Sequence, residues 1–241
     1  MAVTLLVAGA PAVVSATEEK CYSVDVNAWI CGDYWVDRQD EIIEATTTHI
    51  QITVAAVLLG LVIAFPLALI ARGVPRLESS VLGLSTAIYT VPSLALLPLL
   101  VPLTGLTKTT VVIGLGLYCL TILVRAILDG LRSVPDDIRE AAVGIGYSST
   151  RLLLRVELPL ALPVMMAGLR VATVSTVALT TIGTVVSEGG LGYLIADGQS
   201  TEFNAELFAG AVLCVALALT LDLLLVLAQR LATPWRRGLT S

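Results

Sequence analysis

The chain has 241 residues, of which 56% are hydrophobic and only 14% are charged, and its mean hydropathy is +0.91. A soluble domain carries roughly 25% charged residues, so this composition indicates a polytopic membrane protein. The sequence holds a single His and no recognisable nucleophile–base pair or group of metal ligands. It has no Gly-x-x-x-x-Gly-Lys-Ser/Thr phosphate loop, since the nearest candidate, residues 105–109, has the wrong spacing. We therefore expect no catalytic residue, metal site or bound cofactor in this chain. Any ATP hydrolysis must come from another chain.

The first 48 residues form an N-terminal unit with two parts. Residues 2–16 are apolar but fall short of the roughly 20 residues that span a bilayer. Val14-x-Ala16 suits a signal-peptidase site, yet no Lys or Arg precedes it, so three alternatives stay open. They are a cleaved signal, a retained interfacial segment and a misassigned start codon. Residues 17–48 hold eight acids against two basic residues, a net charge of −6 that exceeds the −5 of the whole chain: Glu18, Glu19, Asp25, Asp33, Asp37, Asp40, Glu41 and Glu44 against Lys20 and Arg38.

Two cysteines, Cys21 and Cys31, lie in this acidic stretch. In an oxidising compartment they could pair and close a short loop, and otherwise they would be two free thiols in a mobile tail. Cys119 and Cys214 lie within apolar segments, where a cysteine is usually a small core residue.

Five apolar segments follow and define an all-α transmembrane domain over residues 49–230. The predicted spans are residues 50–71, 81–103, 109–128, 159–186 and 206–228. Residues 46–48 could cap the first span. The second span holds Pro92, Pro98 and Pro102, which predicts an irregular helix buried in protein rather than facing lipid. Gly114 and Gly116 in the third span permit close helix packing.

The fourth span is unusually long. At 1.5 Å per residue it would make about 42 Å of helix, more than the roughly 30 Å of the hydrocarbon layer. We therefore expect it to begin in the cytoplasm or to tilt. Residues 187–205 follow as an outer loop with four glycines around the apolar piece 191–196. A small helix that dips toward the pathway and a plain connecting loop both fit this sequence.

Basic residues are distributed unevenly around the spans. The loops after the first, third and fifth spans hold nine arginines, whereas the opposite side holds only Lys20, Arg38 and Lys108. The positive-inside rule then predicts a multi-pass protein of the cytoplasmic membrane. Residue 48 would lie outside, and the loop 129–158 and the tail 231–241 would lie in the cytoplasm. The nine arginines are Arg72, Arg76, Arg132, Arg139, Arg151, Arg155, Arg230, Arg236 and Arg237.

Three charged residues lie inside or at the ends of apolar spans. Arg125 and Asp222 lie near predicted cytoplasmic ends, where their side chains can reach the interface. Arg170 lies deeper, and we expect it to pair with an acid such as Asp222 rather than to contact the substrate directly.

The loop 129–158 is the longest polar block between two spans. Pro135 can open a helix whose first turn carries Asp136 and Asp137, which the positive end of the helix dipole favours. Ala141 and Ala142 favour a helix and leave little bulk against a partner.

The second half of this block predicts a turn and a further helix. Gly144 and Gly146 suit a helix end and a tight turn. We expect a side chain at Gly146 to obstruct this turn. One of the two serines that follow can cap a short helix over residues 150–156, which would end near Pro159.

The spacing of this block resembles the permease subunits of binding-protein-dependent ABC importers. Their cytoplasmic loop reads Glu-Ala-Ala, three residues, Gly, nine residues, Ile, one residue, Leu-Pro, and this chain matches each spacing with Val156 in place of Ile. The resemblance implies the type I ABC importer permease fold, with a cytoplasmic coupling helix that docks into a groove of an ATPase. The coupling residues that it implies are Glu140, Ala141, Ala142, Gly144, Gly146, Val156, Leu158 and Pro159.

The same resemblance implies several partners. They are a dimer of ATPase subunits that binds ATP and magnesium, a second permease chain (the same or a paralogue) and an extracytoplasmic substrate-binding protein. The lipid bilayer surrounds the assembly, and no nucleic acid is involved.

Other segments resemble the osmoprotectant branch of that family, which imports glycine betaine, carnitine, choline or proline betaine. The similarity covers about residues 46–230 and is carried by segments 89–96, 102–105, 157–163 and 167–174. In such importers the binding protein selects the quaternary ammonium, commonly with an aromatic cage. A permease for methionine or another amino acid with the same fold is the alternative. An ion-coupled secondary transporter would need intramembrane acids and internal repeats, and the chain offers only Asp222 and no repeat.

A compact zwitterion such as glycine betaine carries its own carboxylate, so its path needs few fixed charges. Hydroxyl groups and backbone carbonyls would line such a path, although the same side chains could equally serve helix packing. The candidate path residues are Tyr89, Thr90, Ser93, Tyr118, Arg170, Thr173, Ser175 and Thr176.

Overall fold

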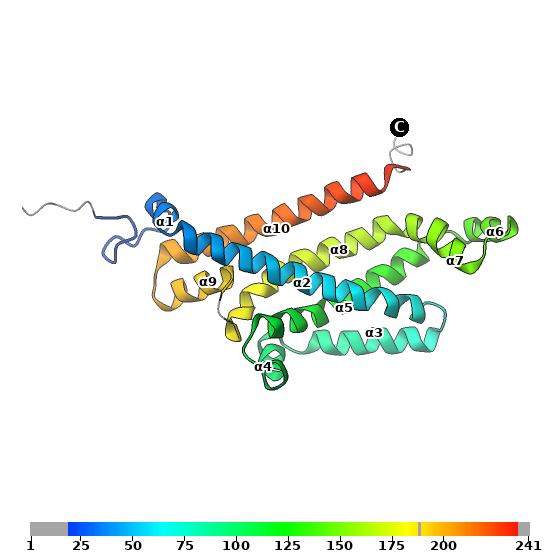
Figure 1. The fold of residues 1–241 in the computed structure, drawn as a ribbon, viewed down its shortest axis with the longest axis horizontal. Helices are drawn as coiled ribbons and strands as arrows, with labels where there is room; N and C mark the ends of the chain where they lie inside the picture. The colour runs from blue at the N-terminus through cyan, green and yellow to red at the C-terminus, as the bar shows by residue number, and fades with distance from the viewer. Residues whose placement is uncertain (1–18, 188, 236–241) are drawn as a thin grey trace, which may run out of the picture.

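The computed structural model describes residues 19–187 and 189–235, and these form helices and the turns that join them (Figure 1). Four helical segments are long and apolar enough to cross a membrane, and the bent pair α3–α4 can make a fifth span. The predicted all-α fold with five spans is therefore confirmed. The elements are α1 (Gly32–Asp37), α2 (Gln39–Ala71), α3 (Pro75–Thr90), α4 (Ser93–Thr104), α5 (Lys108–Arg132), α6 (Asp136–Gly144), α7 (Ser149–Leu152), the π turn η1 (Leu153–Glu157), α8 (Leu158–Thr180), the 3-10 turn η2 (Thr181–Val185), α9 (Leu191–Ser200) and α10 (Asn204–Ala232).

Helix α5 is the centre of the bundle and packs between α2 and α8. Small residues let these helices approach closely, as is common in membranes. A Cβ at Gly60 of α2 would lie 2.6 Å from the Cβ of Cys119, and one at Gly116 of α5 would lie 2.9 Å from Leu59. At Gly168 of α8 it would collide with Ala126. The predicted packing role of Gly116 is confirmed.

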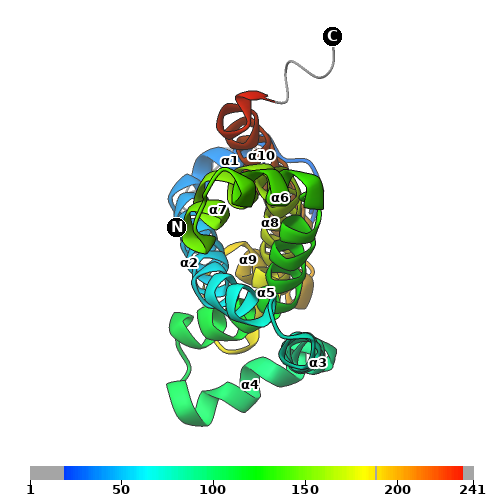
Figure 2. The same ribbon diagram turned by 90° about the vertical axis from the view of Figure 1, so that its right-hand side faces the viewer.

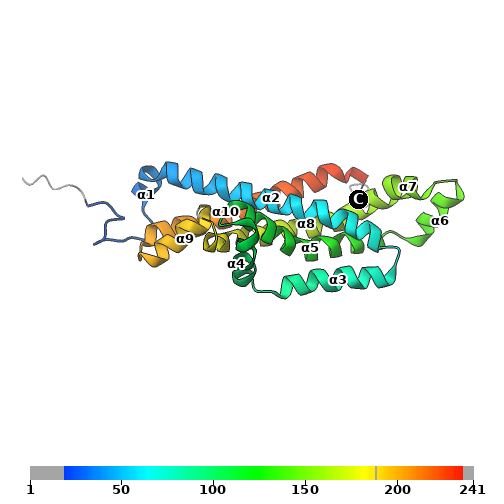
Figure 3. The ribbon, with the colours of Figure 1, turned by 60° about the horizontal axis from the view of Figure 1, so that its bottom comes forward.

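The second predicted span is two helices that meet at a bend of 99°. Pro92 has no N–H and forces Val91 into an extended conformation, with φ −67° and ψ 126°, so α3 ends there. The expected irregularity is confirmed, but the expected burial is wrong for this chain alone. Helix α4 turns away from the bundle (Figure 2) and buries only Leu97, which packs against Gly114, while Leu99 and Leu103 are exposed. Figure 3 shows α3 running along the outside of the bundle beside α5.

Helices α2 and α3 begin well before the predicted spans, which started at residues 50 and 81. Helix α2 begins at Gln39, so residues 46–48 lie inside it and do not cap it, and the Thr46 hydroxyl donates to the Ile42 carbonyl at 2.7 Å. The acidic first turn of α2 favours this earlier start, because acids stabilise a helix N-terminus. The second predicted helix of the loop 129–158 and the fourth span form one continuous segment, Ser149–Val185.

This continuity corrects the prediction that a short helix ends near Pro159. A proline removes one N–H from the helix ladder, and the chain absorbs this by widening to a π turn instead of stopping. The N–H of Leu158 donates to the carbonyl of Leu153, five residues earlier. Helix α8 then continues through Pro159 and Pro163.

The outer loop contains a helix, α9, so the plain connecting loop is excluded. Its glycines are packing residues: a Cβ at Gly192 would collide with the backbone of Thr181, and one at Gly198 would lie 2.6 Å from the backbone nitrogen of Leu207. The expectations for residues 2–16 and for the tail beyond Trp235 fall outside the described residues.

Candidate coupling loop and translocation path

The loop between α5 and α8 is closed by backbone hydrogen bonds at the end of α6. Gly146 has a left-handed conformation with φ +88°. Its N–H donates to the Val143 carbonyl at 2.9 Å, and the Tyr147 N–H donates to the Ala142 carbonyl at 3.1 Å. This bond pair is the Schellman motif, which favours glycine because a side chain is strained at positive φ. The predicted glycine turn is confirmed.

Gly146 is required for its backbone conformation and not for space. A Cβ placed at Gly146 or at Gly144 would meet no atom within 4 Å. The expectation that a side chain here would obstruct the turn is therefore wrong, because the turn lies at an open tip. Gly144 has no such constraint, since its φ lies outside the left-handed region.

The tip of the loop presents a mixed acidic and apolar surface. Glu140 and Ala141 are exposed, as are Val143 and Ile145, which the motif did not single out. Ala142 is buried. Figure 1 places α6 at the far end of the molecule, beyond the ends of α2 and α3. A partner protein would therefore meet one acid, one small residue and two apolar side chains.

The base of the loop is held by a buried carboxylate that sequence reasoning missed. Glu157 is 4% exposed, and its Oε2 lies 2.7 Å from Arg72 Nη1 while its Oε1 lies 3.0 Å from Arg139 Nε. Arg139 also donates to the Leu131 carbonyl at 2.6 Å and pairs with Asp136 at 2.7 Å. One acid therefore connects the inner ends of α2, α5 and α6 to the start of α8. The sequence did hold a signal for this residue, since Glu157 is an acid within Val-Glu-Leu-Pro at the start of an apolar span.

The remaining motif residues lie at this base, away from the tip. Val156 belongs to the π turn, Leu158 and Pro159 begin α8, and all three are partly buried. Leu158 packs against the core around α5. The eight predicted coupling residues thus form two groups, a tip that faces outward and a base that connects the tip to the bundle.

Four of the predicted path residues meet at the α3–α4 bend. The rings of Tyr89 and Tyr118 lie edge to face with centroids 5.6 Å apart, and the Tyr118 hydroxyl donates to the Val91 carbonyl. Thr90 and Ser93 flank the same bend. The Thr90 hydroxyl donates to a carbonyl one turn earlier at 2.7 Å. This group fixes the bend and leaves Tyr89 partly exposed.

The predicted path residues of α8 lie in helix-packing contacts. Thr173 and Thr176 are buried and donate to backbone carbonyls one turn earlier, at 2.8 and 2.7 Å. Thr176 Oγ1 also lies 3.0 Å from Cys119 Sγ on α5. Ser175 is only partly buried. Thr173 and Thr176 therefore serve the α8 ladder and the α5–α8 contact.

Arg170 and Asp222 form a bidentate ion pair between α8 and α10, as predicted. Arg170 Nε lies 2.7 Å from Asp222 Oδ1, and its Nη2 lies 2.8 Å from Oδ2. This fork geometry is the strong form of an arginine–carboxylate pair. Both carboxylate oxygens of Asp222 are thus held by Arg170. Arg125 is exposed.

A second residue that sequence reasoning missed is His49, the single histidine. It is fully buried, its Nε2 lies 3.0 Å from the Val177 carbonyl, and its Nδ1 accepts from the Leu191 N–H at 3.2 Å. These partners define one neutral tautomer, in which Nε2 donates. His49 thereby connects the outer part of α2 to α8 and to the start of α9. Below it, the hydroxyls of Thr53 and Thr180 lie 3.2 Å apart.

Comparison with known protein families matches residues 48–238 to the family described as binding-protein-dependent transport system inner membrane component. The chain belongs to this family. It is therefore a multi-pass membrane permease of a binding-protein-dependent transport system.

Relatives of this permease match most of its length. The choline transport system permease protein OpuBB of Bacillus subtilis is 34% identical over 194 residues, 80% of this chain and 89% of that protein. The osmoprotectant import permease protein OsmW of Salmonella typhimurium is 35% identical over 206 residues, 83% of this chain and 96% of that protein. These relatives are transport subunits.

Solved structures support the same fold. An inward-facing structure of the MetNI methionine ABC transporter matches with a TM-score of 0.74 and 18% identity, covering 85% of this permease and all of that chain. A crystal structure of an amino acid ABC transporter matches with a TM-score of 0.64 and 16% identity, covering 85% and 98%. At these identities the likeness concerns the fold alone.

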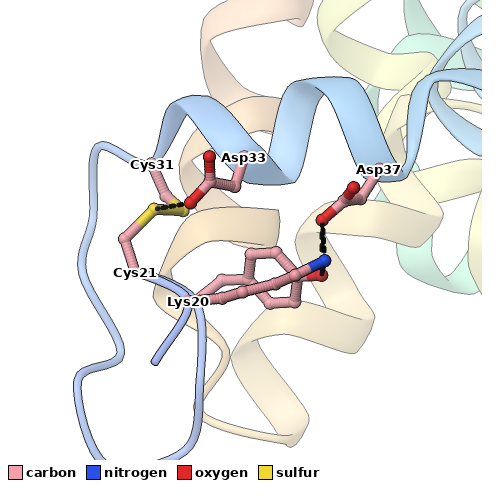
Figure 4. Close-up of a disulfide and its surroundings, with 6 residues drawn as sticks. Lys20, Cys21, Cys31, Asp33 and Asp37 are labelled. Atoms are coloured by element: carbon pink, nitrogen blue, oxygen red, sulfur yellow. Dashed lines mark hydrogen bonds and ion pairs between the residues drawn. A yellow bond between two sulfur atoms is a disulfide. The ribbon is translucent and has the colours of Figure 1, made fainter. Parts of the chain in front are cut away.

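The match to the family model covers residues 48–238, so the segment before residue 48 lies outside that model. Residues 20–47 form a small cap in which Cys21 and Cys31 are joined by a disulfide, with Cα atoms 5.6 Å apart (Figure 4). Lys20 Nζ lies 2.6 Å from Asp37 Oδ2, and the Tyr22 hydroxyl donates to the same oxygen at 2.7 Å. The hydrogen bonds from Lys20 and then Tyr22 lower the pKa of Asp37 below its usual range.

The cap rests on the turn between α9 and α10 through a polar clamp. The Asn27 side chain donates to the Glu202 carbonyl at 2.6 Å and accepts from the Asn204 N–H at 2.9 Å. The Asn204 side chain donates to the Asn27 carbonyl at 3.0 Å. Asn27 and Glu202 are the non-glycine residues with positive φ in the described part of the chain. The clamp therefore fixes two strained residues against each other.

Proposed function

We propose that this chain is a permease subunit of an ATP-driven importer for quaternary-ammonium osmoprotectants such as glycine betaine, carnitine, choline or proline betaine. The observation that supports this most strongly is the likeness to OpuBB and OsmW, each over at least 80% of this chain. A separate binding protein delivers the solute on the outer side, where the cap and α9 lie. The permease sits in the cytoplasmic membrane with its C-terminus in the cytoplasm.

The coupling loop is the part that receives work from a separate ATPase. Its tip exposes Glu140, Ala141, Val143 and Ile145, while Glu157 connects its base to three other helices. A rigid base and an outward tip suit a lever, because force on the tip passes to α2, α5 and α8 together. ATP and magnesium bind to the ATPase dimer, and a second permease chain completes the path.

The conduction path is built with few fixed charges. Asp222 and Arg170 neutralise each other, and the hydroxyls of Thr173 and Thr176 are held by their own helix. A zwitterion that carries its own carboxylate can cross such a path without a strong countercharge in the wall. The two tyrosines at the α3–α4 bend supply an aromatic surface for such a path, and Tyr89 is partly exposed there.

Uptake of radiolabelled solutes tests the proposal. The whole importer, with its binding protein and ATPase, is expressed in a host that lacks osmoprotectant importers. We expect ATP-dependent uptake of glycine betaine, carnitine or choline that requires the binding protein. Uptake of methionine without uptake of these solutes would assign the chain to the amino-acid alternative. Uptake that persists without the ATPase would contradict the importer mechanism itself.

A further inference from the structure

A cavity of about 760 Å³ lies between the cap and the turn that joins α9 to α10. Its walls come from two parts of the chain, the cap and the region around the start of α10. It therefore exists only because this permease carries the cap. From the cap come Tyr22, Ser23, Val24, Asn27 and Arg38, with Glu41 at the start of α2.

The cavity is strongly acidic. Glu41, Asp197, Glu202 and Glu206 line it, against the single cation Arg38, so the lining has a net charge of −3 (one minus four). Arg38 is already engaged, because its Nη1 lies 3.1 Å from Glu41 Oε2. Three carboxylates therefore face the cavity without a basic side chain among its lining residues to neutralise them.

Glu206 is the residue that points to a ligand. It is 5% exposed, lines the cavity, and its Oε1 has no hydrogen-bond partner. Leaving a buried acceptor unsatisfied is costly, and most such atoms in folded proteins have a partner. Ser23 Oγ and Tyr34 Oη are also buried and unpartnered. These three atoms make up the buried unpartnered side-chain oxygens and nitrogens of the described residues, and all belong to the cap or to the first turn of α10 beneath it.

The spacing of the acids favours an organic cation over a metal ion. No three of the acids that line the cavity bring their oxygens within 4.8 Å of one another, whereas a calcium site needs six to eight oxygens at 2.3–2.6 Å. Aromatic rings stand beside the acids. The centroids of Tyr22 and Phe203 lie 6.2 Å apart, and that of Tyr34 lies 5.4 Å from Phe203. Aromatic faces attract quaternary ammonium groups.

We propose that this cavity is an outer site for a small organic cation, of the choline type, on the permease itself. The ammonium group would lie near Glu206 and against Phe203, with the other acids supplying the surrounding negative potential. This inference rests on the proposed function for the choice of solute. It predicts a preference for choline over glycine betaine, because the carboxylate of betaine is repelled by a lining of net charge −3.

Equilibrium binding of radiolabelled choline tests this site. The full-length chain is placed in lipid nanodiscs, and the binding protein is left out. We expect saturable binding that 3,3-dimethylbutan-1-ol, the uncharged carbon isostere of choline, does not displace. Glu206→Gln should weaken binding roughly tenfold or more, since it removes the unpaired charge. Phe203→Leu should weaken it about threefold to thirtyfold. Asp25→Asn is the matched control: it makes the same change of charge at an exposed acid of the same cap, outside the cavity, and should bind like the wild type.

The competition with the neutral isostere uses the wild-type chain, so the test stands even where a variant folds poorly. Variants are compared only when the Cys21–Cys31 disulfide is intact by mass mapping. Absence of saturable choline binding to the wild type, equal binding by Glu206→Gln, or displacement by the neutral isostere would each overturn the proposed site. Loss of binding-protein capture in Glu206→Gln, with no choline binding to the wild type, would make the cavity a docking surface instead.

Uptake by the complete importer separates this inference from the proposed function. Suppose that the importer carries betaine or choline but the permease alone binds no choline. The proposed function then holds, and the proposed outer site is contradicted. An importer that carries only methionine contradicts the proposed function. The choline-binding measurement on the isolated chain then tests the cavity independently.

Discussion

The two ends of this permease are held together by different kinds of interaction. At the end that carries the coupling loop, which our proposal places inside, both oxygens of the buried Glu157 carboxylate are occupied, one by Arg72 and the other by Arg139. At the outer end, the cap is held by a disulfide, a cluster of aromatic rings and an exposed ion pair. That end also holds the buried side-chain atoms without partners in the described residues.

This difference fits the role that we propose for each end. A loop that transmits force must not deform, and a fully paired buried charge network resists deformation because every displacement exposes a charge to apolar surroundings. A surface that meets a solute needs polar groups that remain available. The polar groups at the base of the coupling loop are satisfied within the chain, whereas under our proposal a ligand completes those beneath the cap.

The largest expected effect comes from breaking the inner network. Glu157→Gln removes the charge shared by two guanidinium groups and should destabilise the loop base by about 3 kcal/mol. This is the lower end of the range for buried pairs, because both arginines keep partial contact with water. Hydrogen exchange of amides 137–157 should quicken accordingly, and transport should fail while the outer cap stays unchanged.

Glu140→Gln is the matched control for this substitution. It makes the same chemical change on an exposed residue of the same loop. Hydrogen exchange at the base should stay at the wild-type rate, while capture of the ATPase weakens. Equal exchange in both variants would mean that Glu157 does not hold the base.

The second prediction removes the covalent connection of the outer end. Replacing Cys21 and Cys31 by serine opens a loop with a sequence separation of 10 residues, which should cost about 2–3 kcal/mol, slightly less than a 15-residue loop. The loss should be confined to residues 20–47. Mass mapping without reduction should first find the wild-type pair resistant to alkylation. Exchange that quickens equally in α5 would show that the cap and the core open as one unit.

The third prediction compares two glycines of the coupling loop. Gly146→Ala introduces a side chain at φ +88° and should cost about 1–2 kcal/mol. Gly144→Ala introduces the same methyl group where φ is ordinary and space is open, so it should be neutral or slightly stabilising. The free energy of local opening, from hydrogen exchange around residue 145, measures both. Equal effects in the two variants would rule out the backbone as the cause.

The sequence was sufficient to predict features that depend on local chemistry. Apolar length located the spans, the basic residues of the loops gave an orientation, and glycine spacing located the Schellman turn at Gly146. The pairing of Arg170 with Asp222 was also predictable, since a deep charge in a span needs a partner.

Features that depend on three-dimensional placement were missed. Glu157 is one acid among several in its loop, and nothing local shows that Arg72, 85 residues earlier, lies beside it. The single histidine, His49, entered the sequence analysis only as evidence against catalytic or metal chemistry. In the structure it connects α2 to the carbonyl of Val177. The prolines of the second span predicted an irregular helix. They did not predict that the bend at Pro92 would direct α4 away from the bundle.

The smallest predicted effect concerns the pH dependence of the cap. Hydrogen bonds from Lys20 and Tyr22 hold the pKa of Asp37 below its usual value of about 3.9. A carboxylate with a depressed pKa stabilises the folded state above the unfolded pKa, and this contribution is lost as the pH falls through the folded value. The cap should therefore loosen below about pH 4 and hold its order at neutral pH. Because the pair is exposed, the effect should be small and should shrink further in high salt. Fluorescence of Trp29 and Trp35, followed from pH 6 to pH 2.5, should show an acid step that Asp37→Asn removes. A step of the same size in both proteins would assign the acid sensitivity to other carboxylates and leave the disulfide and the aromatic rings as the interactions that hold the cap.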